Sequence, residues 1–346
     1  MGVQQEAFTK TDDGQDVSKF TIEQGDLRLV VMDFGATLME CHAPDRDGQS
    51  DNIVLSHNSP EAWLRNAPCF GGICGRFANR IAKGQFSLNA VDYQLATNNG
   101  PNHLHGGEVG FHRRLWTAEP FEDADACGVC FAYLAVDGEE GYPGDVEVTV
   151  EYSLNNDNEL VITYEASTTK ATPINLTNHA YWNLRGLSGG GVSVEDQHLR
   201  LFCDQYLPVD ETAIPTGEFA SVKDTVMDFT SAHAIGEMLH DVEGRGYDHC
   251  FVINGERGKL RAAATAFDPQ SGRIMEVATT EPGVQFYTGN FLLGDDNSSG
   301  FSKHQAFCLE AQTFPNAPNE PNFAPLGILN PGEQYAQTTV HRFSVE

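Results

Sequence analysis

The chain has 346 residues, of which 40% are hydrophobic, 10% aromatic and only 20% charged, so it can bury a large core and is not compositionally disordered. Its 21 lysines and arginines stand against 49 aspartates and glutamates, which gives a formal net charge of −28. This field repels phosphate backbones and anionic lipid headgroups. Nucleic acid and membranes are therefore excluded as expected partners, and a neutral substrate is favoured.

The amino-terminal segment, residues 1–6, lacks the apolar core of a signal peptide. Glu6 stands where a myristoylation signal requires serine or threonine. We therefore expect a cytoplasmic protein. The eight cysteines lie mostly in apolar runs, where we expect buried free thiols.

The first predicted elements are strands. Residues 27–41 and 52–55 are rich in apolar and β-branched residues and flank an acidic turn, which predicts a pair of strands. Residues 59–64 then predict a short helix, because Ser59 suits the N-cap and Pro60 the first turn.

The middle of the chain predicts a strand at residues 127–136 and a β-hairpin after it. Apolar and polar residues alternate over residues 146–154, four polar turn residues follow, and residues 160–164 return. Later in the chain we expect a short helix at residues 231–239 and strands at residues 260–267, 274–279 and 305–312.

These patterns predict an all-β fold with few short helices. Neither a low-complexity linker nor a block of charge divides the chain. We therefore expect residues 1–346 to form a single domain, a large antiparallel β-sandwich.

Four polar segments spread over more than 200 residues carry the residues suited to proton transfer. They are residues 102–107, 177–183, 247–249 and 309–312. An imidazole together with a carboxylate is the minimum equipment for moving a proton on and off a neutral polar substrate. The segments are useful together only if the fold brings them to one place.

His103 and His105 alternate around Leu104, so on a strand both would point to one face, as metal ligands in β-barrels often do. A cupin-like metal site is therefore an alternative. Its pattern requires a glutamate at a longer spacing than Glu108 and a glycine where Thr97 stands. We expect no metal site. A second alternative is that His105 is only a hydrogen-bonded turn residue.

His179, Tyr181 and Asn183 would share one face of a strand, with Trp182 on the other. A row of imidazole, phenol and amide groups is typical of sugar sites, because hydroxyl groups need directional partners and sugar C–H faces stack on rings. The alternative is a histidine buried in the core with its hydrogen bonds satisfied.

Glu310 lies in an apolar strand that isolates its carboxylate. Carboxylates are rarely buried without a partner or a purpose, and partial desolvation raises their basicity toward that of a general base. Asp248 precedes a similar apolar run, although its carboxylate could equally anchor a loop.

Five motifs in order resemble those of the aldose 1-epimerases, also called galactose mutarotases. They are residues 75–84, 102–107, 177–184, 282–290 and 309–319, and the similarity runs from about residue 33 to the C-terminus. The resemblance implies a galactose mutarotase-like β-supersandwich with an open carbohydrate cleft. It also implies interconversion of the α and β anomers of free hexoses such as glucose and galactose, without a cofactor.

The resemblance also implies the roles of individual residues. Glu310 matches the general base, His179 the general acid and His105 a second histidine near the ring oxygen. The positions that match contacts to sugar hydroxyls are Asn79, Arg80, Tyr181, Asp248 and Gln285. Ala180 and Trp182 stand where relatives often carry a hydroxyl residue and phenylalanine, a departure that concerns substrate preference.

Two other functions are compatible with the same motifs. A hexose-6-phosphate 1-epimerase would need additional cationic residues at the cleft, and the small number of lysines and arginines argues against it. A non-catalytic sugar-binding or regulatory protein would not need a matched acid and base. We expect an isomerase that acts on a small aldose as a monomer or weak dimer.

We predict that activity requires no metal, because no complete ligand set has the required spacing. Mutarotation measured by polarimetry should be unchanged after dialysis against a strong chelator. A loss of rate that zinc or manganese restores would support the cupin-like alternative.

Overall fold

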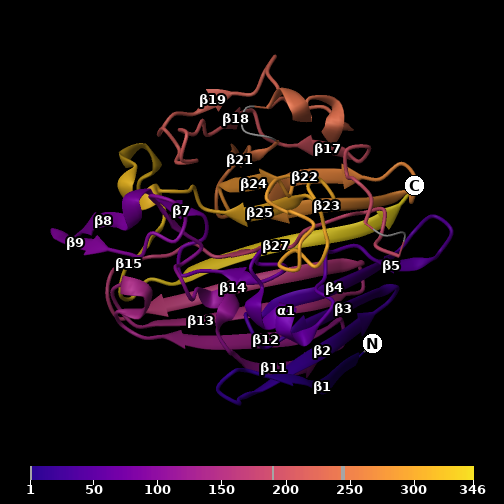
Figure 1. Cartoon of the computed structure of the whole chain (residues 1–346), viewed down its shortest axis with the longest axis horizontal. Coiled ribbons are helices and arrows are strands. Elements are labelled where there is room, and N and C mark those ends of the chain that lie inside the picture. Colours follow the sequence, from indigo (N-terminus) through magenta and orange to yellow (C-terminus); the bar gives the residue numbers. More distant parts are fainter. Residues whose placement is uncertain (1, 189–190, 243–245) are drawn as a thin grey trace.

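The computed structural model describes residues 2–188, 191–242 and 246–346, and its regular structure is mostly β-strand (Figure 1). The largest sheet has nine strands. In spatial order they are β11 (Thr117–Glu122), β12 (Ala126–Ala135), β13 (Val146–Asn155), β14 (Glu159–Thr168), β27 (Tyr335–Val345), β23 (Arg273–Thr279), β22 (Arg261–Phe267), β17 (His198–Leu201) and β20 (His233–Ala234). Long β27 joins the two halves of this sheet by pairing with β14 and β23.

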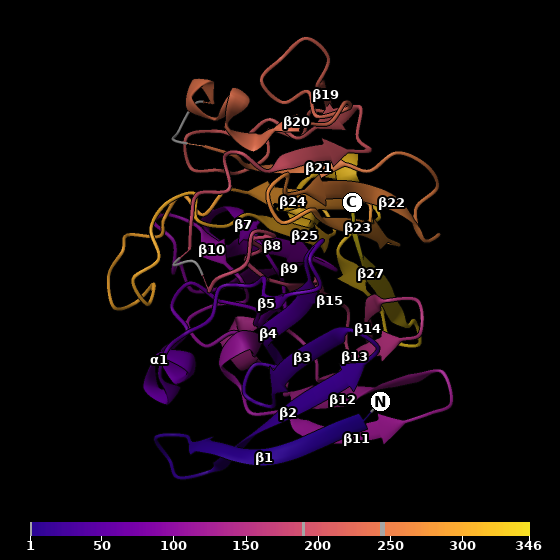
Figure 2. The ribbon, with the colours of Figure 1, turned by 90° about the vertical axis from the view of Figure 1, so that its right-hand side faces the viewer.

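A five-stranded sheet formed by the N-terminal part of the chain packs against one half of the large sheet. Its strands are β1 (Gly2–Lys10), β2 (Asp16–Gln24), β3 (Leu27–Met32), β4 (Thr37–Pro44) and β5 (Ser50–Asn52). Figure 2 shows β1 to β3 beside β11 to β13. Phe20 and Phe131 meet between the layers with ring centroids 6.0 Å apart, so an apolar core lies between the two sheets.

A second five-stranded sheet lies near the other half of the large sheet and carries much of the candidate site (Figure 1). Its order is β19 (Ala220–Ser221), β18 (Gln205–Tyr206), β21 (Asp248–Val252), β24 (Gly283–Tyr287) and β25 (Cys308–Gln312). Gln285 in β24 pairs with Glu310 in β25, and Cys250 in β21 pairs with Gln285. This register places residues from three distant segments on neighbouring strands.

Short two-stranded pairs connect the sheets. They are β7 (Arg80–Ile81) with β10 (His103–Leu104), β6 (Ile73–Cys74) with β16 (Thr177–Asn178), β15 (Thr172–Pro173) with β26 (Ile328–Leu329), and β8 (Gln85–Leu88) with β9 (Val91–Gln94). The strand pairs of all these sheets are antiparallel.

Helical structure is sparse within the described ranges. One α-helix, α1 (Pro60–Arg65), begins where the Ser59 side chain accepts a hydrogen bond from the backbone N–H of Ala62, as the sequence predicts. The remaining helical turns are 3-10 turns at Ala82–Gly84, Phe111–Arg113, Glu139–Gly141, Ile235–Glu237, Leu239–Asp241, Ala317–Asn319 and Pro321–Phe323. No helix of the described chain is both long enough and apolar enough to cross a membrane.

The predicted all-β, antiparallel class is confirmed, as is the hairpin of β13 and β14, whose register closes with Leu154 opposite Leu160. Three element predictions were wrong, one of them the strand expected at residues 52–55, because β5 ends at Asn52. Residues 27–41 form two strands, β3 and β4, because Gly35 and Ala36 adopt positive φ and turn the chain. The helix expected at residues 231–239 is instead a short strand and two 3-10 turns.

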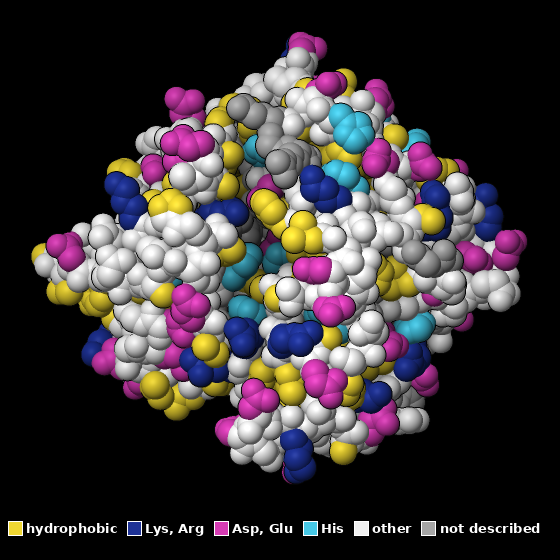
Figure 3. Space-filling view, in the orientation of Figure 1, with side chains coloured by type: hydrophobic (Ala, Val, Ile, Leu, Met, Phe, Trp, Pro, Cys, Tyr) yellow, Lys and Arg dark blue, Asp and Glu magenta, His cyan; other side chains and the backbone are white. Residues whose placement is uncertain are grey.

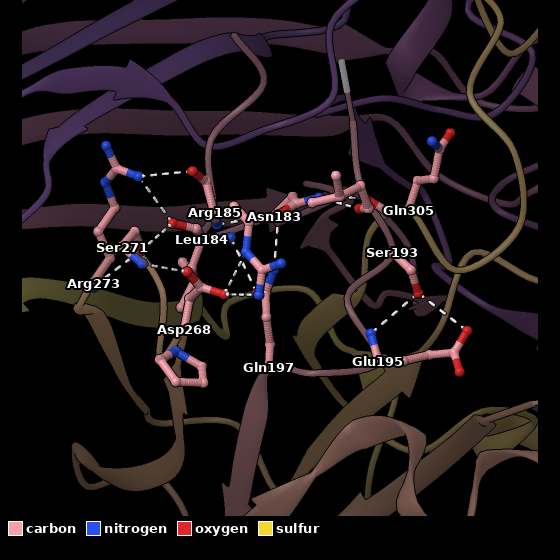
Figure 4. Close-up of polar contacts among 12 residues, drawn as sticks. Asn183, Leu184, Arg185, Ser193, Glu195, Gln197, Asp268, Ser271, Arg273 and Gln305 are labelled. Atoms are coloured by element: carbon pink, nitrogen blue, oxygen red, sulfur yellow. Dashed lines mark hydrogen bonds and ion pairs between the residues drawn. The ribbon is translucent and has the colours of Figure 1, made fainter. Parts of the chain in front are cut away.

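A buried arginine cluster ties the N-terminal sheet to the large sheet (Figure 4). The Arg273 side chain is 2% exposed and donates hydrogen bonds to four backbone carbonyls: those of Ala43, Gln49, Leu184 and Arg185. Arg185 in turn donates to the buried carboxylate of Asp268, at 2.7 Å from Nη2. The guanidinium therefore joins residues 43–49 and residues 184–185 to β23.

We predict that Arg273→Met lowers the free energy of unfolding by about 3 kcal/mol, because it removes charge-assisted hydrogen bonds to four backbone carbonyls, two of them on the buried residues Ala43 and Leu184. Urea unfolding at pH 7 measures this. Arg200→Met is the matched control, since Arg200 is exposed and makes one bond to the Thr230 carbonyl. It should change the stability by less than about 0.5 kcal/mol. Equal effects of the two variants would show that the cluster contributes little.

Candidate active site

A cavity of about 530 Å³ opens beside the β21–β24–β25 sheet. In the space-filling view the surface is hollowed near its centre, where histidine side chains gather and cationic side chains lie close by (Figure 3). The wall of the cavity is formed by residues from several segments: 65–69, 79–80, 98–113, 179–181 and 291–298, together with Asp248, Tyr287 and Glu310. The fold therefore brings the four polar segments of the sequence together.

Glu310 is the buried carboxylate of this cavity. It lies in the middle of β25, between Leu309 and Ala311, and is 3% exposed. Burial raises the pKa of its carboxyl to about 7, with the charge of His179 acting in the opposite direction. Its Oε2 atom has no hydrogen-bond partner among the described residues, which leaves a basic oxygen free for a ligand.

His179 faces Glu310 across the cavity wall, with Nε2 at 3.7 Å from the Glu310 Oε2. Backbone hydrogen bonds to Gly71 and Gly72 hold the residue on both sides. Its ring stacks on Tyr181 at 4.9 Å and 14°, and the Cys308 Sγ lies 3.6 Å from Nδ1. Burial raises the pKa of the Cys308 thiol well above its ordinary value, so this thiol stays protonated.

The Cys308 contact suits both protonation states of His179. A thiol can donate to Nδ1 of a neutral ring and can weakly accept from Nδ1–H of an imidazolium. In either state Nε2 remains directed toward Glu310 and is available for proton transfer.

His105 is the second histidine of the cavity, with its ring centroid 5.2 Å from that of His179. Its Nδ1 accepts a hydrogen bond from the backbone N–H of Asn79 at 3.2 Å, which places any ring proton of the neutral form on Nε2. Burial lowers the pKa of His105 to about 3. His105 is therefore a neutral hydrogen-bond donor at neutral pH.

Arg80, Asp248 and Gln285 form a polar chain on the other side of Glu310. The Arg80 Nη2 lies 3.7 Å from one oxygen of Asp248, and the Gln285 amide donates to the other at 2.7 Å. Arg80 also donates through Nε to the side chain of Asn99. The carboxylate is thus fixed in orientation by two partners, as a hydroxyl-binding group needs to be.

Seven of the eight predicted site residues line the cavity: Asn79, Arg80, His105, His179, Tyr181, Asp248 and Glu310. Gln285 does not line it, although its amide donates to the wall residue Asp248 and its strand position pairs with that of Glu310. Tyr181 lines the wall with its ring, while its hydroxyl donates to the Pro68 carbonyl at 3.0 Å. The roles of all eight stay predictions.

Two expectations about neighbouring residues were wrong. Asn183 is fully buried away from the cavity, where it donates to the carbonyls of Val192 and Gln305 (Figure 4). His103 and His105 do not share a face, because the strand ends at Leu104 and His105 has a φ of 50°. His103 instead contacts the Ala96 carbonyl and the Tyr142 hydroxyl, so the arrangement on which the cupin-like alternative depends is not formed.

Several residues in or beside the cavity wall were not predicted from the sequence. Cys308 is one residue removed from the Glu310 motif, but its contact with His179 depends on a pairing across the fold. Arg65 and Arg113 reach the cavity from two separate loops, and Phe291 and Leu293 are exposed at its wall, 69% and 75% respectively. No local pattern signals such residues, because only the tertiary fold makes them neighbours.

Comparison with known proteins agrees with this geometry. The family model described as aldose 1-epimerase matches residues 18–342. The galactose mutarotase of Bos taurus is 44% identical over 332 residues, covering 95% of this chain and 94% of the relative. The aldose 1-epimerase of Escherichia coli (strain K12) is 36% identical over 342 residues, covering 96% and 97%.

Among solved structures, the galactose 1-epimerase from Lactobacillus acidophilus NCFM superimposes with a TM-score of 0.88 at 30% identity, covering 99% of each chain. Fold and sequence thus give the same answer. The chain belongs to the aldose 1-epimerase family.

Proposed function

We propose that this protein is an aldose 1-epimerase that interconverts the α and β anomers of free hexoses such as glucose and galactose. The observation that carries the proposal is the Glu310–His179 pair, whose facing atoms are 3.7 Å apart in the wall of the cavity. A carboxylate and an imidazole at this separation can act on two neighbouring oxygens of one small molecule. The relatives named as galactose mutarotase and aldose 1-epimerase support the same reaction.

In this mechanism Glu310 removes the proton of the anomeric hydroxyl, while His179 in its protonated form donates a proton to the ring oxygen. The ring bond between the anomeric carbon and that oxygen breaks, and the open-chain aldehyde forms. The terminal bond rotates, and the same two groups reverse their roles to close the ring on the other face. Each properly placed acid or base typically increases the reaction rate by ~10²–10⁴-fold. The mechanism requires no covalent intermediate.

His105, Asn79, Arg80 and Asp248 would hold the sugar. His105 offers a donor from Nε2 near His179, while Asp248 and Arg80 offer an acceptor and a donor to hydroxyl groups. Gln285 would act through Asp248 by fixing the carboxylate, and Tyr181 by supporting the His179 ring. We propose that residues 1–346 act as one catalytic domain, because this set draws on both halves of the chain.

A hexose 6-phosphate remains the second candidate substrate, because Arg65 and Arg113 line the cavity although they are distant in sequence. Glu108 and Asp295 also line it and offset their charge. The free sugar is therefore preferred. Polarimetry of freshly dissolved α-glucose, α-galactose and α-glucose 6-phosphate tests this directly, and faster turnover of the phosphate would reverse the assignment.

We predict that kcat/KM rises with pH through a midpoint near 7 on the acid side. Burial raises the pKa of Glu310 to about 7, and only the ionised form can accept the anomeric proton. Below about pH 6 the value of kcat/KM should fall roughly tenfold per pH unit. Polarimetry from pH 5 to 9, corrected for the buffer rate, measures this. A midpoint near 4.5 would contradict the assignment of the base.

We predict that Glu310→Gln lowers turnover by at least ~100-fold, because the amide keeps the shape but cannot take a proton. Sugar binding, measured by calorimetry, should survive, since the loss concerns a group that acts in the transition state. Glu281→Gln is the matched control: burial likewise raises the pKa of Glu281 to about 7, but Glu281 does not line the cavity. It should leave turnover unchanged.

Asp248→Asn should behave in the opposite way and mainly weaken sugar binding, because a charge-assisted hydrogen bond is lost while the acid and base remain. Near-normal mutarotation by folded Glu310→Gln protein would show that Glu310 is not the base. If Glu310→Gln lost sugar binding but kept its turnover, this result would also show that Glu310 is not the base.

A further inference from the structure

Three buried side chains at the cavity have no part in the proposed reaction: Cys69, Cys74 and His112. Cys69 follows α1, Cys74 lies in β6, and His112 lies in the 3-10 turn Phe111–Arg113. One ligand atom of each, two Sγ atoms and a ring nitrogen, lies within 4.8 Å of the others. Both cysteines are free thiols. Such a set of two sulfurs and one nitrogen is a common ligand set for zinc.

The local fold brings these groups together. Gly72 lies between the two cysteines, and a Cβ atom there would come within 2.8 Å of the His112 Cβ. The glycine therefore permits the close approach of His112 to the segment that carries both thiols. The same segment hydrogen-bonds to the backbone of His179 through Gly71 and Gly72, so the cluster is adjacent to the catalytic histidine.

The cluster is polar and incompletely satisfied. His112 is 7% exposed, and its Nδ1 is buried without a hydrogen-bond partner in the described part of the chain. Cys69 is 8% exposed and Cys74 is fully buried, so two thiols and an imidazole share one desolvated position. A bound metal ion would take the two sulfurs as thiolates.

We propose that Cys69, Cys74 and His112 form a binding site for Zn²⁺, with a fourth coordination position directed toward the sugar cavity. Cys69 and His112 line this cavity and Cys74 does not, so the open side of the site faces the ligand space. Two thiolates would neutralise the ion in a buried setting. The site is separate from the acid and base, and the proposal does not depend on the sugar reaction.

A second group, His179, Cys308 and Glu310, also lies within ligand distance of one another. It offers one sulfur, one nitrogen and one carboxylate oxygen. A thiophilic ion prefers the set with two sulfurs, since soft ligands favour zinc over harder cations. The number of thiolates bound to the ion therefore distinguishes the two groups.

The experiment is a titration of the reduced, chelator-treated full-length protein with Co²⁺, a spectroscopic substitute for Zn²⁺. We expect one equivalent to bind with a sulfur-to-cobalt charge-transfer band of two-thiolate intensity and tetrahedral d–d bands, and Zn²⁺ to displace it. Cys69→Ser and Cys74→Ser should each lower the band and weaken Zn²⁺ binding at least ~100-fold, since even outer-shell partners of metal ligands contribute 10–100-fold. Cys308→Ser and Cys130→Ser are the controls and should retain it.

A measurement on the unmodified protein keeps the proposal testable if a variant fails to fold. Zn²⁺ should protect Cys69, which lines the cavity, from alkylation as mapped by mass spectrometry, whereas alkylation of the partly exposed Cys130 should be unchanged. Absence of a charge-transfer band, or a one-thiolate band that Cys308→Ser removes, would overturn the proposal. Neither readout involves mutarotation, so failure here would leave the proposed function intact.

Discussion

The site depends on one constraint, the burial of the Glu310 carboxylate next to an imidazole without a direct hydrogen bond. Burial raises the pKa of Glu310 from 4.5 to about 7 in the folded protein. The folded state therefore favours the neutral acid, and stability declines as pH rises from the unfolded value through about 7. Ionised Glu310 costs the fold about 3 kcal/mol above that pH. This unfavourable term is what makes the group a useful base at neutral pH.

The surrounding fold has to hold the pair in place against this cost. Glu310 lies on a strand flanked by the register partner Gln285, and His179 is fixed by backbone bonds to Gly71 and Gly72. His179 directly follows the short strand β16. Elsewhere, Arg273 ties carbonyls of separate segments and keeps the N-terminal sheet in position. The favourable packing of the large sheets offsets the free-energy cost of burying the Glu310 charge.

The family resemblance supplied Asn79 and Arg80 as site residues, whereas local patterns predicted many of the strands, because alternation and turn residues are properties of a few consecutive positions. The hairpin of β13 and β14 is an example. Local patterns failed where tertiary contacts determine the position of a side chain. Asn183 was expected beside His179 on one strand face, yet the chain leaves the strand after Asn178, and the amide is bonded in the core.

The same limit applies to residues that the fold gathers from distant segments. Arg65 and Arg113 reach one cavity although nothing in their spacing indicates it, and His112 reaches Cys69 and Cys74 in the same way. Gln285 was predicted as a contact to the sugar, but the register of β21, β24 and β25 turns its amide to Asp248. A motif identifies the residue type that a site needs, whereas the pairing of strands decides what that side chain touches.

The two cavity histidines, His105 and His179, have different roles because their surroundings differ. With ring centroids 5.2 Å apart, two imidazolium rings would repel each other. His105 avoids this, because burial lowers its pKa to about 3 and the Asn79 N–H donates to its Nδ1. His179 is the ring that faces Glu310. The neutral His105 thus determines which histidine can serve as the acid, although in the proposed mechanism it transfers no proton itself.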